Sequence, residues 1–216
     1  MNRKEILEDM FFMTADVGSI TIPEDIKERD KRLERALKRL ARGKSQSLDD
    51  IYELTKGSVY GFILSILKNP EDAEDVMQDT YVKVCLNAAQ YQAQGKPMAW
   101  ILTIARNLSL MRIRSQKRIA DIPDYEWDAI ADENSEFGSE DRMVLKAALD
   151  KVSKEESQIV VLHAVAGLKH REIAEMLDMP LATVLSKYNR AIKKLAKLID
   201  EEKVQGKSDR RGRTHE

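Results

Sequence analysis

A helix, a sharp break and a second helix occupy residues 167–195, and this stretch constrains the fold more than any other part of the chain. Ile173 and Leu177 belong to an apolar stripe on the first helix. Pro180 separates the two helices, because proline lacks the N–H that a helix interior requires and suits the first turn of a new helix. The second helix repeats apolar residues every three or four positions, at Leu181, Val184, Tyr188, Ala191 and Leu195.

The opposite face of the second helix is basic. No acidic residue occurs between Leu181 and Ile199. The face carries hydroxyl and cationic side chains, namely Thr183, Ser186, Lys187, Arg190, Lys194 and Lys197. A short helix followed by such a helix is typical of proteins that read the DNA major groove. A solvated helical hairpin is the alternative, and the combination of turn, stripe and one-sided charge favours DNA binding.

Composition excludes several classes of protein. A chain of 216 residues can form one large or two small domains, and its net charge of −1 hides strong local segregation. The single cysteine, Cys85, excludes a disulfide framework, and its helical context predicts a buried, inert thiol. No apolar run reaches the roughly 20 residues of a membrane helix, and residues 1–13 are too acidic for a signal peptide. We therefore expect an all-α cytoplasmic protein without membrane insertion.

Two helices are predicted before residue 69. The first spans about Asp30 to Arg42, and the second begins at Ser47, a good N-cap, and runs on to Lys68. Residues 1 to about 30 form an N-terminal extension with no clear pattern. The apolar residues around Phe12 in this extension fit a docking helix or disorder equally well.

A third helix is predicted from Pro70, with Asn69 as its N-cap. Ala73, Val76, Met77, Thr80 and Val84 face inward in this pattern. Acidic residues line the outer face, at Glu71, Asp72, Asp75 and Asp79. The first acids complement the helix dipole, but Asp79 lies two turns into the helix, which favours an acidic docking surface. A metal site from Glu71, Asp75 and Asp79 is the alternative, and it lacks a second acidic cluster.

A basic helix is predicted after Pro97. Its expected core stripe is Ile101, Ile104, Ala105, Leu108 and Met111. Its other side combines an aromatic residue with polar and cationic ones, namely Trp100, Thr103, Asn107 and Arg114, flanked by Arg106, Arg112, Lys117 and Arg118. Cations neutralise phosphates and rings stack on unpaired bases, so this side suits nucleic acid. Trp100 as an ordinary core residue is an equally good interpretation.

Residues 119–141 mark a domain boundary, because they contain nine acidic residues and no lysine or arginine. A helix is expected from Arg142 to Lys151. Another begins at Ser153, which has Glu156 in capping-box spacing, and ends at Gly167. The expected organisation is an extension (1–30), a helical domain (31–118), an acidic linker (119–141), a helix-turn-helix domain (142–200) and a disordered basic tail (201–216).

Taken in order, these segments resemble a bacterial sigma factor of the extracytoplasmic-function (ECF) group, the two-domain type of the sigma-70 family. Residues 69–81 resemble the acidic helix of the family's region 2. Residues 99–108, with the basic run that follows, resemble its promoter-melting segment. Residues 167–191 resemble the helix-turn-helix of region 4. Each motif alone is modest, and their order across most of the chain makes the resemblance specific.

The resemblance implies a transcription initiation factor with no catalytic activity, cofactor or metal. Its implied partners are core RNA polymerase, promoter DNA and an anti-sigma factor. The polymerase-binding residues would be Asp72, Glu74, Asp75, Gln78 and Asp79. The minus-ten element would be bound by Lys96, Trp100, Thr103, Arg106, Asn107, Arg112 and Arg114. The minus-thirty-five element would be bound by His170, Arg171, Thr183, Ser186, Lys187, Arg190 and Lys194.

The chain departs from the family pattern at several positions. Asp178 and Ala182 stand where glycines are usual, and Leu185 and Ile192 stand where cations are usual. Met111 stands where an aspartate is usual. Leu185 and Ile192 remove two expected phosphate contacts.

Two other function classes stay open at this point. A helix-turn-helix regulator that does not recruit polymerase would need a dimerisation element. A carboxylate–metal enzyme would need a second acidic cluster, and His163, His170 and His215 are too scattered in the sequence for a metal triad.

Overall fold

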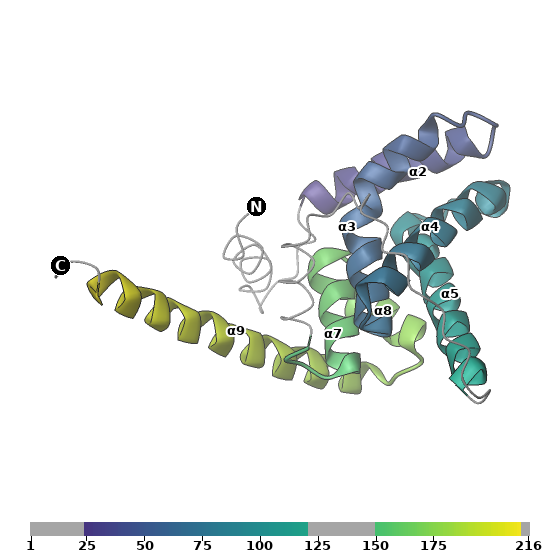
Figure 1. Cartoon of the computed structure of the whole chain (residues 1–216). Coiled ribbons are helices and arrows are strands. Elements are labelled where there is room, and N and C mark those ends of the chain that lie inside the picture. Colours follow the sequence, from purple (N-terminus) through teal and green to yellow (C-terminus); the bar gives the residue numbers. More distant parts are fainter. Residues whose placement is uncertain (1–23, 121–149, 213–216) are drawn as a thin grey trace.

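The computed structural model describes residues 24–120 and 150–212, with side chains placed for 26–116 and 150–197. Every regular element in these ranges is a helix (Figure 1), as the sequence predicted. The elements are α2 (Glu24–Leu40), α3 (Ser47–Leu67), α4 (Pro70–Asn87), η1 (Ala88–Gln90), α5 (Pro97–Ala120), α7 (Lys154–Val160), η2 (Val161–Val165), α8 (His170–Leu177) and α9 (Leu181–Gly212). None of the described helices is long and apolar enough to cross a membrane.

Helix α3 lies at the centre of the molecule. Every residue from Ser58 to Ile66 is buried, so the second half of this helix is covered on all sides. Two of its polar side chains form hydrogen bonds within the helix: Thr55 Oγ1 donates to the Ile51 carbonyl and Ser65 Oγ to the Phe62 carbonyl, both at 2.6 Å. Helices α2, α4 and α5 pack against α3, and so do α7 and η2 (Figure 1).

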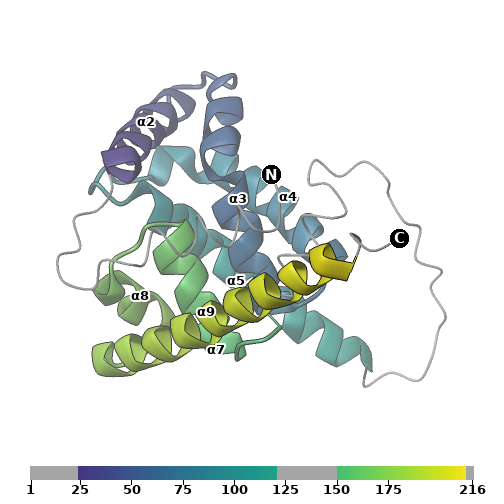
Figure 2. The same ribbon diagram turned by 90° about the vertical axis from the view of Figure 1, so that its left-hand side faces the viewer.

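The two helical units predicted from the sequence therefore share one continuous hydrophobic core. Polar contacts join them as well. Arg29 Nη2 of α2 donates to the Ala166 carbonyl at 2.7 Å, and Ser58 Oγ of α3 donates to the Val165 carbonyl at 3.2 Å. Both carbonyls belong to the short segment that leads into the helix-turn-helix. Helix α9 crosses α7 (Figure 2) and then extends away from the core (Figure 1).

Two of the three predicted N-caps are confirmed. Asn69 Oδ1 accepts from the backbone N–H groups of Glu71 and Asp72 at 2.9 and 3.2 Å. Ser153 and Glu156 form the reciprocal capping box. Ser47 is not a cap, because the chain enters α3 through a tight turn and already has helical backbone angles at residue 46. Ser47 is instead the buried first residue of α3.

Two predicted boundaries were wrong. Helix α2 begins at Glu24, so part of the supposed extension 1–30 belongs to the folded body. Helix α9 continues to Gly212 where a disordered tail was expected, and no proline interrupts residues 201–212. The segment around Phe12, the acidic stretch 121–141 and residues 142–149 lie outside the described residues.

Two burial predictions also failed. The buried stripe of α5 is Met98, Ile101, Leu102, Ala105 and Ser109, whereas Met111 is 59% exposed. The stripe is rotated because α5 packs on α2, α3 and α4 together. Cys85 is exposed, because residues 82, 85 and 86 form the outer side of α4.

The segment before the helix-turn-helix makes an unusual turn. A single π-turn, η2, follows α7, and Ala166 N–H bonds the Val161 carbonyl at 2.9 Å. Gly167 then adopts the left-handed conformation predicted for it, with φ of 77°. A Cβ at this position would come within 2.7 Å of Ile26 Cδ1 on α2. Glycine is therefore required both by the backbone angle and by the close approach of α2.

We expect Gly167→Ala to lower the free energy of unfolding by about 1–2 kcal/mol, because alanine is strained at positive φ and displaces Ile26. Chemical denaturation followed by circular dichroism measures this. Gly57→Ala is the matched control, since Gly57 lies in α3 with open space around it, and it should stabilise by about 0.5–1 kcal/mol. Equal stability of the two variants would contradict the structural role of Gly167.

Candidate functional site

The outer face of α4 changes character along its length. Asp75, Gln78 and Asp79 are exposed in its first half. Val82 and Leu86 continue the same face in its second half, with 56% and 68% of their surface exposed. Large apolar side chains this exposed are informative when they lie together. The face therefore combines an acidic half with an apolar half.

The apolar half borders a groove between α3 and α4. This groove has a volume of about 720 Å³. It is lined by Leu48, Asp49, Tyr52 and Glu53 of α3 and by Gln78, Tyr81, Val82, Cys85 and Leu86 of α4. The rings of Tyr52 and Tyr81 meet edge to face at 4.8 Å. Sequence reasoning missed this groove, although the i, i+4 spacing of Val82 and Leu86 on the acidic face was a signal that could have found it.

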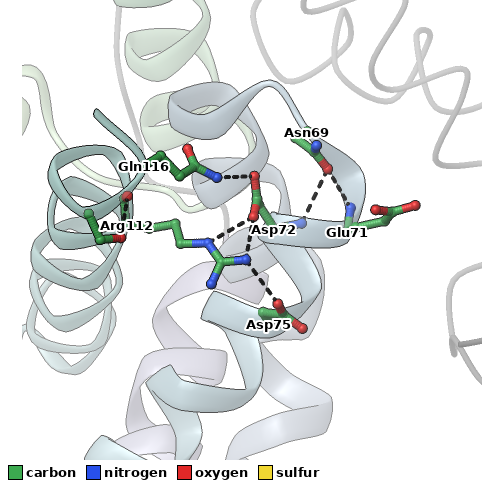
Figure 3. Close-up of polar contacts among 7 residues, drawn as sticks. Asn69, Glu71, Asp72, Asp75, Arg112 and Gln116 are labelled. Atoms are coloured by element: carbon green, nitrogen blue, oxygen red, sulfur yellow. Dashed lines mark hydrogen bonds and ion pairs between the residues drawn. The ribbon is translucent and has the colours of Figure 1, made fainter. Parts of the chain in front are cut away.

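Asp72, in contrast, is turned inward (Figure 3). The side chain is buried, and its two oxygens accept from Arg112 Nε and Gln116 Nε2, each at 2.8 Å. Arg112 also approaches Asp75 Oδ2 at 3.3 Å. The prediction that Asp72 lies on the outer face was wrong, because it connects the first turn of α4 to α5. Glu74 is half-buried.

The predicted minus-ten residues lie along α5 and the loop before it. Thr103, Asn107 and Arg114 are exposed, and Arg106 is half-buried. Trp100 is half-buried and packs on Tyr91 with ring centroids 5.2 Å apart, so it has both a packed and an accessible side. Lys96 makes an ion pair of 3.2 Å with Glu172 of α8. Arg112 makes ion pairs with both Asp72 and Asp75 of α4.

The helix-turn-helix forms as predicted. Asp178 occupies the left-handed turn position with φ of 55°, which explains why a glycine is usual there. Val184, Tyr188, Ala191 and Leu195 are buried and Leu181 is half-buried. Thr183 and Lys187 are half-buried, while Ser186, Arg190 and Lys194 are exposed, as is Arg171 on α8.

Acids of α7 neutralise part of this basic face. Lys187 makes an ion pair with Glu155. Lys194 Nζ lies 2.8 Å from Glu156 Oε2. Arg190 contacts only the Ser186 carbonyl of its own helix, at 3.4 Å, within the part of the chain that the structure describes. Among these three cations of α9, Arg190 is therefore the one whose charge is least neutralised by acidic side chains of the protein.

His170 does not sit on the exposed face where a phosphate contact was predicted. Its ring stacks on His163, with centroids 4.0 Å apart, and both rings meet Tyr188 of α9 at 4.9 Å. His163 Nδ1 donates to the Leu168 carbonyl at 2.8 Å. Sequence spacing could not show that two of the histidines are neighbours. Within the described residues, no group of three or more His, Cys, Asp or Glu side chains is placed to hold a metal ion.

We expect Asp72→Ala to destabilise the protein by about 1–3 kcal/mol, because Arg112 and Gln116 lose their buried acceptor. Asp79→Ala removes an exposed carboxylate from the same helix and should change stability by less than about 0.5 kcal/mol. Parallel urea unfolding curves compare them. A neutral Asp72→Ala variant would show that the contact does not support the fold.

Acidification is expected to weaken the helix-turn-helix. Burial, and then the neighbouring His163, lower the pKa of His170 to about 4, and burial also lowers the pKa of His163. The unfolded chain binds these protons from about pH 6.5 downward and the folded chain only at lower pH. Stability from these groups is therefore complete above about pH 7 and is lost as the pH falls towards 4. Melting temperatures between pH 7.5 and 5 measure the loss.

The variant His170→Gln removes one of the titrating groups from this experiment. Its melting temperature should depend less on pH than that of the wild type, even if it is lower throughout. The same pH dependence in both proteins would contradict the assignment to the histidine pair.

Comparison with known proteins gives two family matches in chain order. Residues 51–119 match the family model for Sigma-70 region 2, and residues 142–195 match the model for Sigma-70, region 4. The chain is 27% identical over 182 residues to the ECF RNA polymerase sigma factor SigK of Mycobacterium ulcerans, which covers 80% of this chain and 96% of that protein. For SigK of Mycolicibacterium vanbaalenii the identity is 28% over 175 residues, with 77% and 89% covered.

Two solved structures share the fold. One is CnrH in complex with the cytosolic domain of CnrY, with a TM-score of 0.54, 20% identity, and 79% of this chain and 98% of CnrH covered. The other is the sigma factor RpoE in complex with the anti-sigma factor NepR from Bartonella quintana, with a TM-score of 0.54, 23% identity, and coverage of 70% and 96%. The two matched regions make up more than half of the sequence and occur in the order expected from the motifs. The chain belongs to the ECF sigma factors of the sigma-70 family, with a region 2 and a region 4.

Proposed function

We propose that this chain binds core RNA polymerase and directs it to specific promoters. The observation that carries the proposal is the ordered pair of region 2 and region 4 matches in one chain. Sigma factors are regulatory proteins, and the polymerase performs the chemistry of RNA synthesis. This chain would supply promoter recognition and strand separation. Two modest DNA-binding surfaces suffice for that, because attachment to one polymerase raises their effective concentration at the promoter.

The polymerase-binding surface in this proposal is the outer face of α4. Exposed Asp75, Gln78 and Asp79 would attract a basic partner and set its orientation, since surface charge mainly affects association rate and specificity. Val82 and Leu86 beside them would supply apolar burial, which gives most of the affinity. A regulator that only binds DNA has no need for such a face. The mixed character of α4 therefore supports the sigma-factor function.

The DNA-binding surfaces would be α5 for the minus-ten element and α9 for the minus-thirty-five element. On α5, the accessible side of Trp100 is suited to stacking with an unpaired base, and Thr103 and Asn107 can hydrogen-bond base edges. On α9, Ser186 and Arg190 are exposed for contacts in the major groove. Arg171 on the preceding helix would contact phosphate, which fixes position without reading sequence.

The described arrangement fits a closed state of the protein. Lys96, at the start of the minus-ten surface, is ion-paired with Glu172 of the helix-turn-helix at 3.2 Å. The two promoter elements are about 25 base pairs apart by their names, or about 85 Å of duplex at roughly 3.4 Å per pair. Region 2 and region 4 cannot occupy both elements while they pack together. We infer that they separate when the protein engages polymerase and promoter.

A protein inhibitor is a further part of the proposal. RpoE of Bartonella quintana was solved with an anti-sigma factor, and CnrH with the cytosolic domain of CnrY. The groove between α3 and α4 offers an apolar surface for a partner of this kind, with Tyr52 and Leu86 at its border. An inhibitor bound there would compete directly with polymerase for the outer face of α4.

The polymerase surface is tested with Asp79→Lys combined with Leu86→Asp. We expect this variant to lose at least about tenfold in affinity for core polymerase, because it removes both the charge and the apolar contact. Its melting temperature should stay close to that of the wild type, since both side chains are exposed. Glu175→Lys, an exposed acid on α8, is the control and should bind core polymerase normally.

Run-off transcription from genomic promoters completes this test. The wild type should direct promoter-specific transcripts, and the α4 variant should not. A wild-type protein that binds DNA but never core polymerase would instead be a helix-turn-helix regulator.

The closed state is tested by a reversible cross-link. A Cβ on residue 167 would lie 2.8 Å from Ile26 Cγ2, close enough for a disulfide between Ile26→Cys and Gly167→Cys in a Cys85→Ser background. The oxidised protein should give no promoter-specific transcript, and reduction should restore transcription. Each single-cysteine variant controls for the substitutions themselves. Full activity of the oxidised protein would show that separation is not required.

A further inference from the structure

Helix α2 carries a cationic stripe that the two family matches do not include, because the first of them begins at residue 51. Seven lysines and arginines and one acid lie between Lys31 and Lys44. We define the stripe as Arg32, Arg35, Lys38, Arg39 and Arg42, all of which are exposed. The helical repeat places the first four on one side of α2, opposite the buried residues Leu33, Ala36, Leu37 and Leu40, and Arg42 lies in the turn after the helix.

The stripe borders a cavity of about 510 Å³ whose other wall is formed by Asp50 and Leu54 of α3. Three of the five cations form ion pairs with acidic side chains. The pairs are Arg39 with Asp50 at 2.6 Å, Arg35 with Glu28 at 3.2 Å and Lys38 with Glu34 at 3.0 Å. Arg32 and Arg42 have no side-chain partner among the residues that the structure describes. The described part of the chain therefore leaves positive charge uncompensated at both ends of the stripe.

A merely solvated helix does not account for this arrangement. Like charges three or four residues apart destabilise a helix, and Arg32, Arg35 and Arg39 of α2 follow that spacing. Four of the five cations are arginines, whose planar guanidinium groups match the oxygens of phosphate better than lysine does. The geometry favours a ligand with several phosphates.

The length and place of the stripe point to a nucleic-acid strand. Arg32 and Arg39 are seven residues apart in α2, or about 10 Å along its axis, and Arg42 lies in the turn that follows. At roughly 3.4 Å per nucleotide, the helical part of the stripe matches about three nucleotides of one strand. Helix α2 also packs on α5, and both border a cavity that includes Lys31, Lys96 and Ala99. The stripe thus lies on the same body as the start of the minus-ten surface.

We propose that the cationic stripe of α2 binds the phosphate backbone of promoter DNA next to the minus-ten element. The place of this contact in the polymerase complex rests on the proposed function. The affinity for DNA rests on the stripe alone. The contacts would be independent of sequence and would add to those of α5 and α9. An acidic protein surface is the competing ligand, and the experiment separates the two.

The test uses the full chain with Arg32→Gln and Arg42→Gln, the two cations without partners. A matched control, Lys83→Gln with Lys151→Gln, removes the same charge from exposed positions on other elements. The affinity of each protein for duplex DNA is measured between about 50 and 300 mM salt. For two lost phosphate contacts, the slope of log affinity against log salt should become shallower by about 1.8 in the stripe variant only.

The same proteins are then measured with core polymerase. Affinity for the polymerase and the preference for promoter over shuffled DNA should not change in the stripe variant. An unchanged salt slope would overturn the proposal, and so would a loss of polymerase binding, which would identify a protein ligand. Because the first measurement needs only the chain and DNA, it decides the proposal even if the proposed recruitment of polymerase to promoters fails its own test.

Discussion

The burial of the second half of α3 on all sides is the constraint on which the rest of the structure depends. Nine consecutive residues of this helix, from Ser58 to Ile66, are buried, and no single neighbouring helix can cover such a surface. Helices α2, α4 and α5 cover part of it, while α7 and η2 of the second region cover another part. The same burial thus builds region 2 and holds region 4 against it. Any separation of the two regions must expose apolar surface of α3, which a large partner such as a polymerase would have to compensate.

The charged contacts across this arrangement are easier to exchange than the apolar ones. Lys96 and Lys187 face DNA in the proposed complex, yet here they pair with Glu172 and Glu155. Pairs of this partly exposed kind contribute about 0–1 kcal/mol each, so phosphate can replace the carboxylates at little cost. Asp72 and Arg112 are different, because Asp72 is buried and has a second partner in Gln116. The chain therefore uses similar ion pairs for two purposes, and burial distinguishes the structural one from the exchangeable ones.

Local sequence signals predicted the secondary structure and the family well. The caps at Asn69 and Ser153, the left-handed Gly167 and the apolar repeat of α9 follow from interactions within a few residues, so short-range chemistry determines them. The failures have a common cause in long-range packing. Met111 and Cys85 fit an apolar pattern but are exposed, because the orientation of α4 and α5 is set by their contacts with α3. Periodicity indicates that a helix has an inner side, and the neighbouring helices decide which residues occupy it.

By itself the sequence determined an all-helical chain, the order of the region 2 and region 4 motifs and the residue types available on each candidate surface. Only the tertiary structure decided which of those residues are free to act. It turned Asp72 inward and left Asp79 exposed, and it placed His170 against His163 and Tyr188 instead of on the surface. It also brought Val82 and Leu86 beside Tyr52 and aligned the arginines of α2 along a cavity. The physical reason is that accessibility and charge compensation depend on residues distant in sequence, which meet only when the helices pack.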